Sequence, residues 1–189
     1  MRCTLSLLAS AMILAAPAAG LAQTPKYNVG TPLSQEEIKS FDFMIGPQGQ
    51  QLPAGSGSAK DGAVIFAKRC EVCHGKNGES GVLRRLVLGK PGQPFRGPFK
   101  PEDRDSVAYY PYAPIVWDYI NRAMPVPKPG TLTPDEVYAL TAFLLYRNGI
   151  IAETDVMDDK SLPKVEMPNK NGFVPAKPVY PPAKNPSWY

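Results

Sequence analysis

The sequence contains very little histidine and cysteine. Its 189 residues include one histidine, His74, and three cysteines, Cys3, Cys70 and Cys73. A zinc site needs about four nitrogen, sulfur or oxygen ligands, so such a site would be hard to complete in this chain. A thioredoxin-like redox pair would require a βαβ pattern around the neighbouring cysteines, and the sequence shows none. Both common explanations for a close pair of cysteines are therefore disfavoured.

The sequence also lacks an apolar run long enough to span a membrane. Its longest apolar stretch, residues 5–16, is shorter than the ~20 residues that a spanning helix needs. The stretch follows Arg2 and leads into small residues that end at Ala22, which is typical of a secretory signal peptide. We therefore expect residues 1–22 to be cleaved on export to the periplasm. Cys3 leaves with this segment, and the mature chain keeps only the close pair.

The close pair belongs to the run Cys70-Glu71-Val72-Cys73-His74-Gly75. A C-x-x-C-H run is the attachment motif of a c-type haem. Two thiols one helical turn apart can each form a thioether with a haem vinyl group, and the following imidazole is then placed to bind the iron. Gly75 adds no side chain beside the porphyrin. Because the motif occurs once, we expect one covalently attached haem c.

The hydrophobic periodicity predicts short helices and no long strands. Ser34 and Glu37 form a capping-box pattern for a helix over residues 34–41. Further helices are predicted from Ser58 to the haem motif, over residues 115–122, and from Pro134 to a stop at Gly149. Gly62 lies inside the helix predicted to begin at Ser58. Glycine at an interior position makes helix formation about 1 kcal/mol less favourable than alanine does. Close packing against another helix would compensate for that cost.

The remaining segments are rich in proline and glycine. We divide the chain into a signal peptide (1–22), an N-terminal extension and linker (23–57), a haem domain (58–150) and a proline-rich tail (151–189). Residues 53–58 have the composition of a linker. The tail is expected to lack a core of its own. Both appendages carry isolated apolar residues, so they are expected either to wrap the domain or to bind a partner.

The second iron ligand cannot be another histidine. The possible sixth ligands are methionine, lysine and an N-terminal amine, and the position could also be empty. Met124 is favoured because it follows a short predicted helix and directly precedes Pro125, which fixes φ and removes an N–H donor. The other methionines of the mature chain, Met44, Met157 and Met167, lie in the appendages, and methionine is often only core filler.

Charge is distributed unevenly along the chain. Residues 60–100 hold nine Lys and Arg against three acidic residues, whereas residues 101–160 hold five against ten. A basic block around the haem motif would steer acidic partners toward it, although it could equally serve solubility. Nucleic acid is not an expected partner, because the basic residues follow no known binding motif.

Donors to the haem propionates are expected among the polar residues between the two predicted ligands. Propionates are anions that need hydrogen-bond donors or cations. The candidates are Arg84, Arg85, Tyr109, Tyr110 and Trp117.

The chain from Gly62 to Tyr146 resembles a class I cytochrome c. The matching pattern is Gly62-x3-Phe66, the haem motif, Met124-Pro125 and Leu140-x2-Phe143. The resemblance implies an all-α domain of about four short helices around one haem, with the first and last helices crossing at Gly62.

A closer resemblance extends over residues 34–174. Its segments look like the cytochrome subunits of sulfite-type molybdenum dehydrogenases, most of all the haem subunit of the Sox sulfane dehydrogenase. They are residues 52–58, 116–125, 132–141 and 162–169. That subunit usually carries a second haem, for which this chain has no motif, and the insert at residues 83–105 is unmatched.

The resemblance implies a non-enzymatic periplasmic electron carrier. It would accept electrons from an exported molybdenum dehydrogenase and pass them to another cytochrome or an oxidase. The alternatives are a haem enzyme, for peroxide reduction or thiosulfate oxidation, and a small-ligand sensor. Both need an exchangeable sixth iron ligand, and Met124 argues against one.

Overall fold

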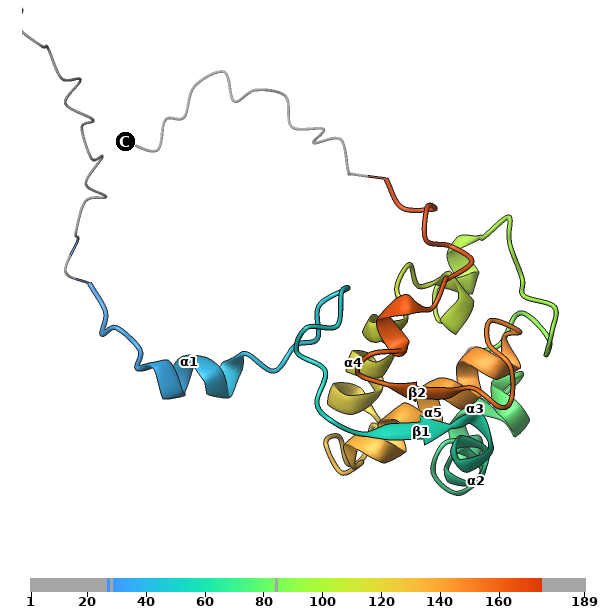
Figure 1. The fold of residues 1–189 in the computed structure, drawn as a ribbon, viewed down its shortest axis with the longest axis horizontal. Coiled ribbons are helices and arrows are strands. Elements are labelled where there is room, and N and C mark those ends of the chain that lie inside the picture. Colours follow the sequence, from blue (N-terminus) through green and yellow to red (C-terminus); the bar gives the residue numbers. More distant parts are fainter. Residues whose placement is uncertain (1–26, 28, 84, 175–189) are drawn as a thin grey trace, which may run out of the picture.

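The structure is a computed structural model that describes residues 27, 29–83 and 85–174. Apart from the first helix, its α-helices and its one small sheet are arranged around a single core (Figure 1). The helices are α1 (Gln35–Phe41), α2 (Ala59–Arg69), α3 (Glu71–His74), α4 (Ala113–Ala123) and α5 (Pro134–Arg147). The strands are β1 (Ser56–Ser58) and β2 (Val156–Asp158). Short 3-10 turns lie at Lys76–Gly78, Pro101–Asp103, Val107–Tyr109 and Leu162–Lys164.

Helix α5 is the centre of the core. Thr133 caps its N-terminus through the predicted capping box with Glu136, and Pro134 occupies the first helical position. Nine successive residues, 137–145, are buried. Gly149, with φ of +73°, ends the helix in the left-handed conformation that glycine adopts without cost. The predicted boundaries of this helix are confirmed.

Helix α2 packs against α5 at the predicted glycine. A Cβ atom on Gly62 would overlap the backbone carbonyl of Ala139 and lie 2.7 Å from the Cβ of Phe143. The ring centroids of Phe66 and Phe143 are 5.1 Å apart. The crossing of the two helices is therefore confirmed, with Ala139 rather than Leu140 supplying the nearest atom.

Helix α4 starts two residues earlier than predicted and buries its expected apolar face. Val116, Trp117 and Ile120 are all buried. The Trp117 ring packs against Tyr138 of α5, with centroids 5.4 Å apart. Met124 is the C-cap residue, so the helix ends at the predicted iron ligand.

The two appendages contribute more to the fold than the sequence indicated. Part of the predicted linker forms β1, which pairs antiparallel with β2 so that Gly57 lies opposite Met157. Three apolar side chains of the predicted tail are buried in the core: Met157, Leu162 and Met167. As far as residue 174, the tail therefore wraps the domain, which was one of the two expected outcomes.

No helix in the described part of the chain is both long enough and apolar enough to cross a bilayer. The predicted signal peptide, residues 1–22, lies outside the described residues.

Replacing Gly62 with leucine should destabilise the protein by about 1–3 kcal/mol or more, because a side chain there overlaps the backbone of α5. Equilibrium denaturation by guanidinium measures the change. Ala67→Leu is the matched control, because Ala67 lies on the exposed side of the same helix. Equal stability of the two variants would show that the close contact between α2 and α5 is not needed.

Candidate functional site

The haem motif occupies a single turn at the end of α2. Cys70 ends α2 and begins the four-residue helix α3, which contains Cys73 and His74. The His74 N–H donates to the carbonyl of Cys70 at 3.0 Å. This local geometry holds both thiols and the imidazole together, as their spacing predicted.

The segment after the motif folds back tightly upon it. Gly75 has φ of +72°, and a Cβ atom there would overlap the carbonyl of Ser80. The Leu83 N–H donates to the carbonyl of Cys73 at 3.1 Å. Glycine is needed at position 75 for this close backbone approach. That reason differs from the expected one, which was space beside the porphyrin.

Two adjoining cavities next to the motif form one apolar cleft. Their volumes are about 380 and 390 Å³. Six residues line both cavities: His74, Leu83, Leu86, Ile120, Met124 and Leu144. At one end the cleft reaches both motif cysteines, and at the other it reaches Asp105, Tyr110 and Tyr119.

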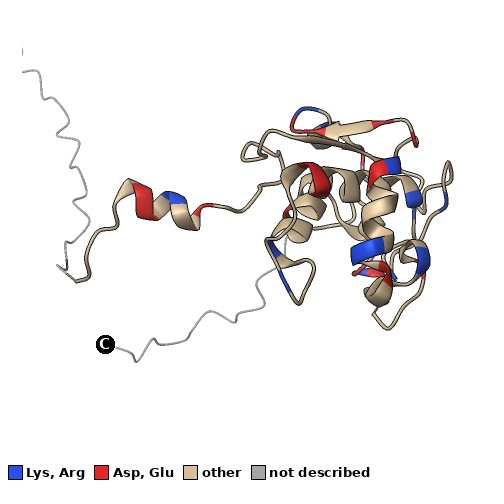
Figure 2. Ribbon diagram, turned by 90° about the horizontal axis from the view of Figure 1, so that it is seen from below, with Lys and Arg blue, Asp and Glu red and all other residues tan. Residues whose placement is uncertain are grey.

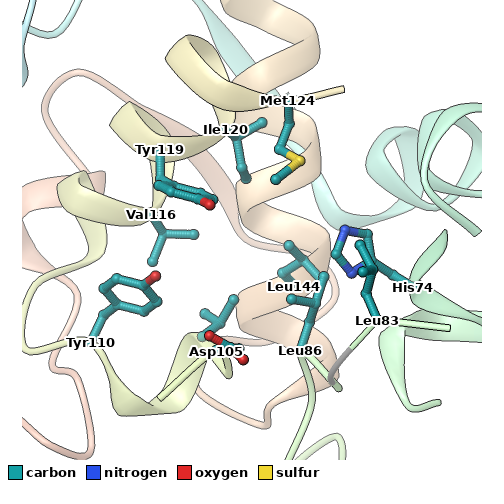
Figure 3. Close-up of a pocket in the computed structure, with 11 residues that line it drawn as sticks. His74, Leu83, Leu86, Asp105, Tyr110, Val116, Tyr119, Ile120, Met124 and Leu144 are labelled. Atoms are coloured by element: carbon teal, nitrogen blue, oxygen red, sulfur yellow. The ribbon is translucent and has the colours of Figure 1, made fainter. Parts of the chain in front are cut away.

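The two predicted iron ligands come to this cleft from different elements. The His74 imidazole extends from α3, and the Met124 side chain extends from the end of α4. Figure 3 shows both side chains directed into the same cavity. About 50 residues separate them in sequence, yet the fold brings them to one site.

The three other methionines of the predicted mature chain do not line the cleft. Met157 and Met167 are buried elsewhere in the core, and Met44 is 59% exposed. Among the described methionines, Met124 is therefore the one placed to face His74.

No disulfide joins the two cysteines of the haem motif. Burial raises the pKa of the Cys70 thiol to about 11, so that thiol stays protonated near neutral pH. Thiols that act as redox nucleophiles have lowered pKa values instead. The described residues also contain no group of three or more His, Cys, Asp or Glu side chains suited to a metal ion. The raised pKa of Cys70 is therefore unlike that of a redox-active thiol.

Of the predicted propionate partners that the structure describes, Tyr110 is the one that lines the cleft. Tyr110 lines the cleft, and burial raises the pKa of its hydroxyl, with smaller contributions from nearby Tyr119 and Asp105. The Arg85 guanidinium lies 3.3 Å from the carboxylate of Asp103. Arg84 lies outside the described residues.

The remaining two candidates do not line the cleft. The Tyr109 ring makes edge-to-face contacts with Phe99 and Phe173. The Trp117 ring faces α5, and its indole N–H is buried with no hydrogen-bond partner among the described residues. Donation from Trp117 to a propionate therefore stays a prediction.

Several residues that line the cleft were not singled out from the sequence. Leu144 follows Leu140 by one helical turn, so the apolar stripe of α5 contained the signal for it. Asp105, Tyr119, Leu83 and Leu86 carried no such signal. Three of these lie in the proline- and glycine-rich region, where periodicity cannot be used.

The side chains around the cleft fit a covalently attached haem. Two thiols, an imidazole and a thioether sulfur are the groups that attach a haem and bind its iron from both sides. Leucine and isoleucine side chains form an apolar surface for the ring. At the polar end, Tyr110 and Tyr119 bring hydroxyl groups to the cleft (Figure 3), and a hydroxyl can donate to an anionic group.

Comparisons with known proteins agree with this interpretation. The family model described as cytochrome c matches residues 59–148. The crystal structure of the sulfane dehydrogenase SoxCD from Paracoccus pantotrophus contains a chain that is 35% identical in sequence, with a TM-score of 0.66. The match covers 80% of this chain and 73% of that chain. No curated protein matches the sequence significantly.

Replacing Gly75 with alanine should destabilise the protein more than the same change at Gly92. Both glycines have a positive φ, +72° and +74°, so a side chain at either position strains the backbone. Only at Gly75 does the added carbon meet neighbouring backbone, whereas nothing lies within 4 Å at Gly92. We expect the difference in the free energy of unfolding to be at least about 1 kcal/mol.

Thermal and guanidinium denaturation measure this difference. Equal losses in the two variants would show that the contact between Gly75 and Ser80 does not hold the motif in place.

Proposed function

Because the chain belongs to the cytochrome c family, we propose that it is a periplasmic carrier of single electrons with one covalently attached haem. The family assignment confirms the all-α class I cytochrome c fold that the sequence predicted. The proposed donor is a sulfite- or sulfane-type molybdenum dehydrogenase. The proposed acceptor is another cytochrome or an oxidase.

Four side chains would hold the haem. Cys70 and Cys73 would form the thioether bonds, while the His74 imidazole and the Met124 thioether would bind the iron. When bound, the haem supplies an iron that exchanges one electron reversibly. The leucines of the cleft would exclude water from the ring, and methionine as a ligand would favour a higher reduction potential.

The single observation that carries this proposal is that the Met124 side chain enters the same apolar cleft as His74. If His74 and Met124 both bound the iron, no position would remain open to peroxide, thiosulfate or a gas. A haem enzyme or a small-ligand sensor would need an exchangeable sixth ligand. The geometry therefore favours a carrier, with these two functions as the alternatives.

The partner is inferred from the likeness to the sulfane dehydrogenase. That likeness supports a molybdenum dehydrogenase as the electron donor. The single haem is inferred from the single C-x-x-C-H motif. Export to the periplasm is inferred from the composition of residues 1–22 and agrees with the maturation of c-type haem outside the cytoplasm.

Replacing Met124 with alanine should leave the haem covalently attached but open the iron to external ligands. The oxidised wild type should show the weak near-infrared band of sulfur-to-iron charge transfer, and the variant should lack it. The reduced variant should bind CO, whereas the reduced wild type should not. Absorption spectra and the mass of the denatured protein, with one retained haem per chain, provide the measurements.

Met44→Ala is the matched control, because Met44 is exposed and does not line the cleft. It should keep the near-infrared band. Loss of the band in a Met44, Met157 or Met167 variant, but not in the Met124 variant, would assign the ligand to an appendage. Full CO binding by the reduced wild type would favour the sensor or enzyme alternative instead.

The proposed role itself is tested by mixing the oxidised cytochrome with the molybdenum dehydrogenase from its own cells and that enzyme's substrate. Stopped-flow absorption should show haem reduction with a second-order rate constant above about 10⁵ M⁻¹s⁻¹. The rate should fall as salt is added, if the basic block around the motif steers the encounter. Reduction that is no faster with the dehydrogenase than without it would remove this enzyme as the donor.

A further inference from the structure

A short helix stands apart from the folded domain. We call residues 29–44 the N-terminal arm; they contain α1, which projects away from the rest of the described chain (Figure 1). None of the residues of α1 is buried. The arm nevertheless carries six large apolar side chains that are 42–87% exposed: Val29, Leu33, Ile38, Phe41, Phe43 and Met44.

The sequence specifies this helix strongly although the helix buries nothing. The Ser34 hydroxyl accepts from the Glu37 N–H at 3.2 Å, and the Glu37 carboxylate accepts from the Ser34 N–H at 2.8 Å. Leu33 and Ile38 occupy the two positions of a hydrophobic staple. An isolated helix of seven residues is marginal in water even when it is well capped. Such a helix gains its stability when its apolar face is covered.

The apolar side chains of the arm are suited to a groove. Ile38 and Phe41 are three residues apart and therefore project from one face of α1. The charged residues of the arm are Glu36, Glu37 and Asp42 against Lys39. Figure 2 shows acidic positions on α1 and just after it. This composition fits an apolar groove edged by basic residues, the mode in which amphipathic helices bind partner proteins.

The root of the arm is fixed to the haem domain. The Ile45 N–H donates to the Asp118 carboxylate at 2.9 Å, and Asp118 is buried on α4. The Arg122 guanidinium donates to both oxygens of that carboxylate, at 2.6 to 3.0 Å. Helix α4 ends at Met124, which lines the cleft. A partner bound to the arm would therefore have a fixed position relative to the cleft.

The similarity to the SoxCD chain extends beyond the domain. A match over 80% of 189 residues corresponds to about 151 residues, whereas residues 45–174 number only 130. Only 15 residues follow residue 174, so about six or more of the matched residues precede residue 45. That solved structure is of the dehydrogenase SoxCD, so a partner enzyme is favoured over a second copy of this chain.

We propose that the N-terminal arm is the docking element for the molybdenum dehydrogenase, with Ile38 and Phe41 inserted into an apolar, basic-rimmed groove of that enzyme. This inference rests on the proposed function. Docking through the arm would tether the donor, while the basic block around the haem motif would steer its approach. Aromatic and aliphatic anchors in desolvated pockets provide most of the binding energy of such interfaces.

Binding of the haem-loaded full chain to the purified dehydrogenase tests the proposal by isothermal titration calorimetry. Ile38→Asp/Phe41→Asp should weaken the affinity at least about 30-fold, the equivalent of one strong anchor. Val64→Asp is the matched control, because Val64 is 54% exposed on α2, outside the arm; its affinity should stay within about threefold of the wild type. Haem spectra and melting temperatures should be unchanged in both variants.

An affinity of the double variant equal to that of the wild type would overturn the docking role of the arm alone, since electron transfer from the dehydrogenase would persist. Failure of the wild type both to bind and to be reduced would overturn the proposed function together with this inference. A lowered melting temperature in the double variant would show that the arm covers its own domain. The wild type could also form a dimer in sedimentation velocity that the double variant does not form. If the double variant then bound the dehydrogenase as tightly as the wild type does, the arm would bind a second copy of this chain.

Discussion

The close contact between α2 and α5 determines where the haem motif lies. The contact depends on Gly62, because any side chain there would meet the backbone of Ala139. Helix α2 ends at Cys70, and α5 supplies Leu140 and Leu144 to the wall of the cleft. The same packing that buries α5 therefore places both thiols and the imidazole beside an apolar surface. A wider separation of the two helices would move the motif away from that wall.

Buried polar groups hold the other parts of the cleft. Asn148, which is fully buried, accepts from the Leu88 N–H at 3.0 Å and donates to the carbonyls of Leu86 and Leu144. This side chain fixes an irregular loop against the end of α5, so that Leu86 can line the cleft. Asp118 has a similar role for α4, which it ties to the chain at Ile45. Helix packing positions His74, while buried side-chain hydrogen bonds anchor the helix that ends at Met124.

The sequence predicted the features that depend on local chemistry. Capping boxes at Ser34 and Thr133, the stop at Gly149 and the haem motif were each visible over a few residues. The pairing of β1 with β2 was not, because each strand has three residues and the two lie about 100 residues apart. The orientation of Trp117 could not be predicted either, since an aromatic residue on an amphipathic helix can face the core or a cofactor equally well. The reason for Gly75 required the path of the following loop.

The measurement that tests the central claim most directly is X-ray absorption at the iron edge of the purified, oxidised protein. The account assigns the imidazole of His74 and the thioether of Met124 as the side chains that would bind the iron of one haem. It therefore predicts a single sulfur neighbour in the first coordination shell, with nitrogen as every other neighbour. A first shell of nitrogen alone, or one that includes a water or lysine ligand, would contradict the account.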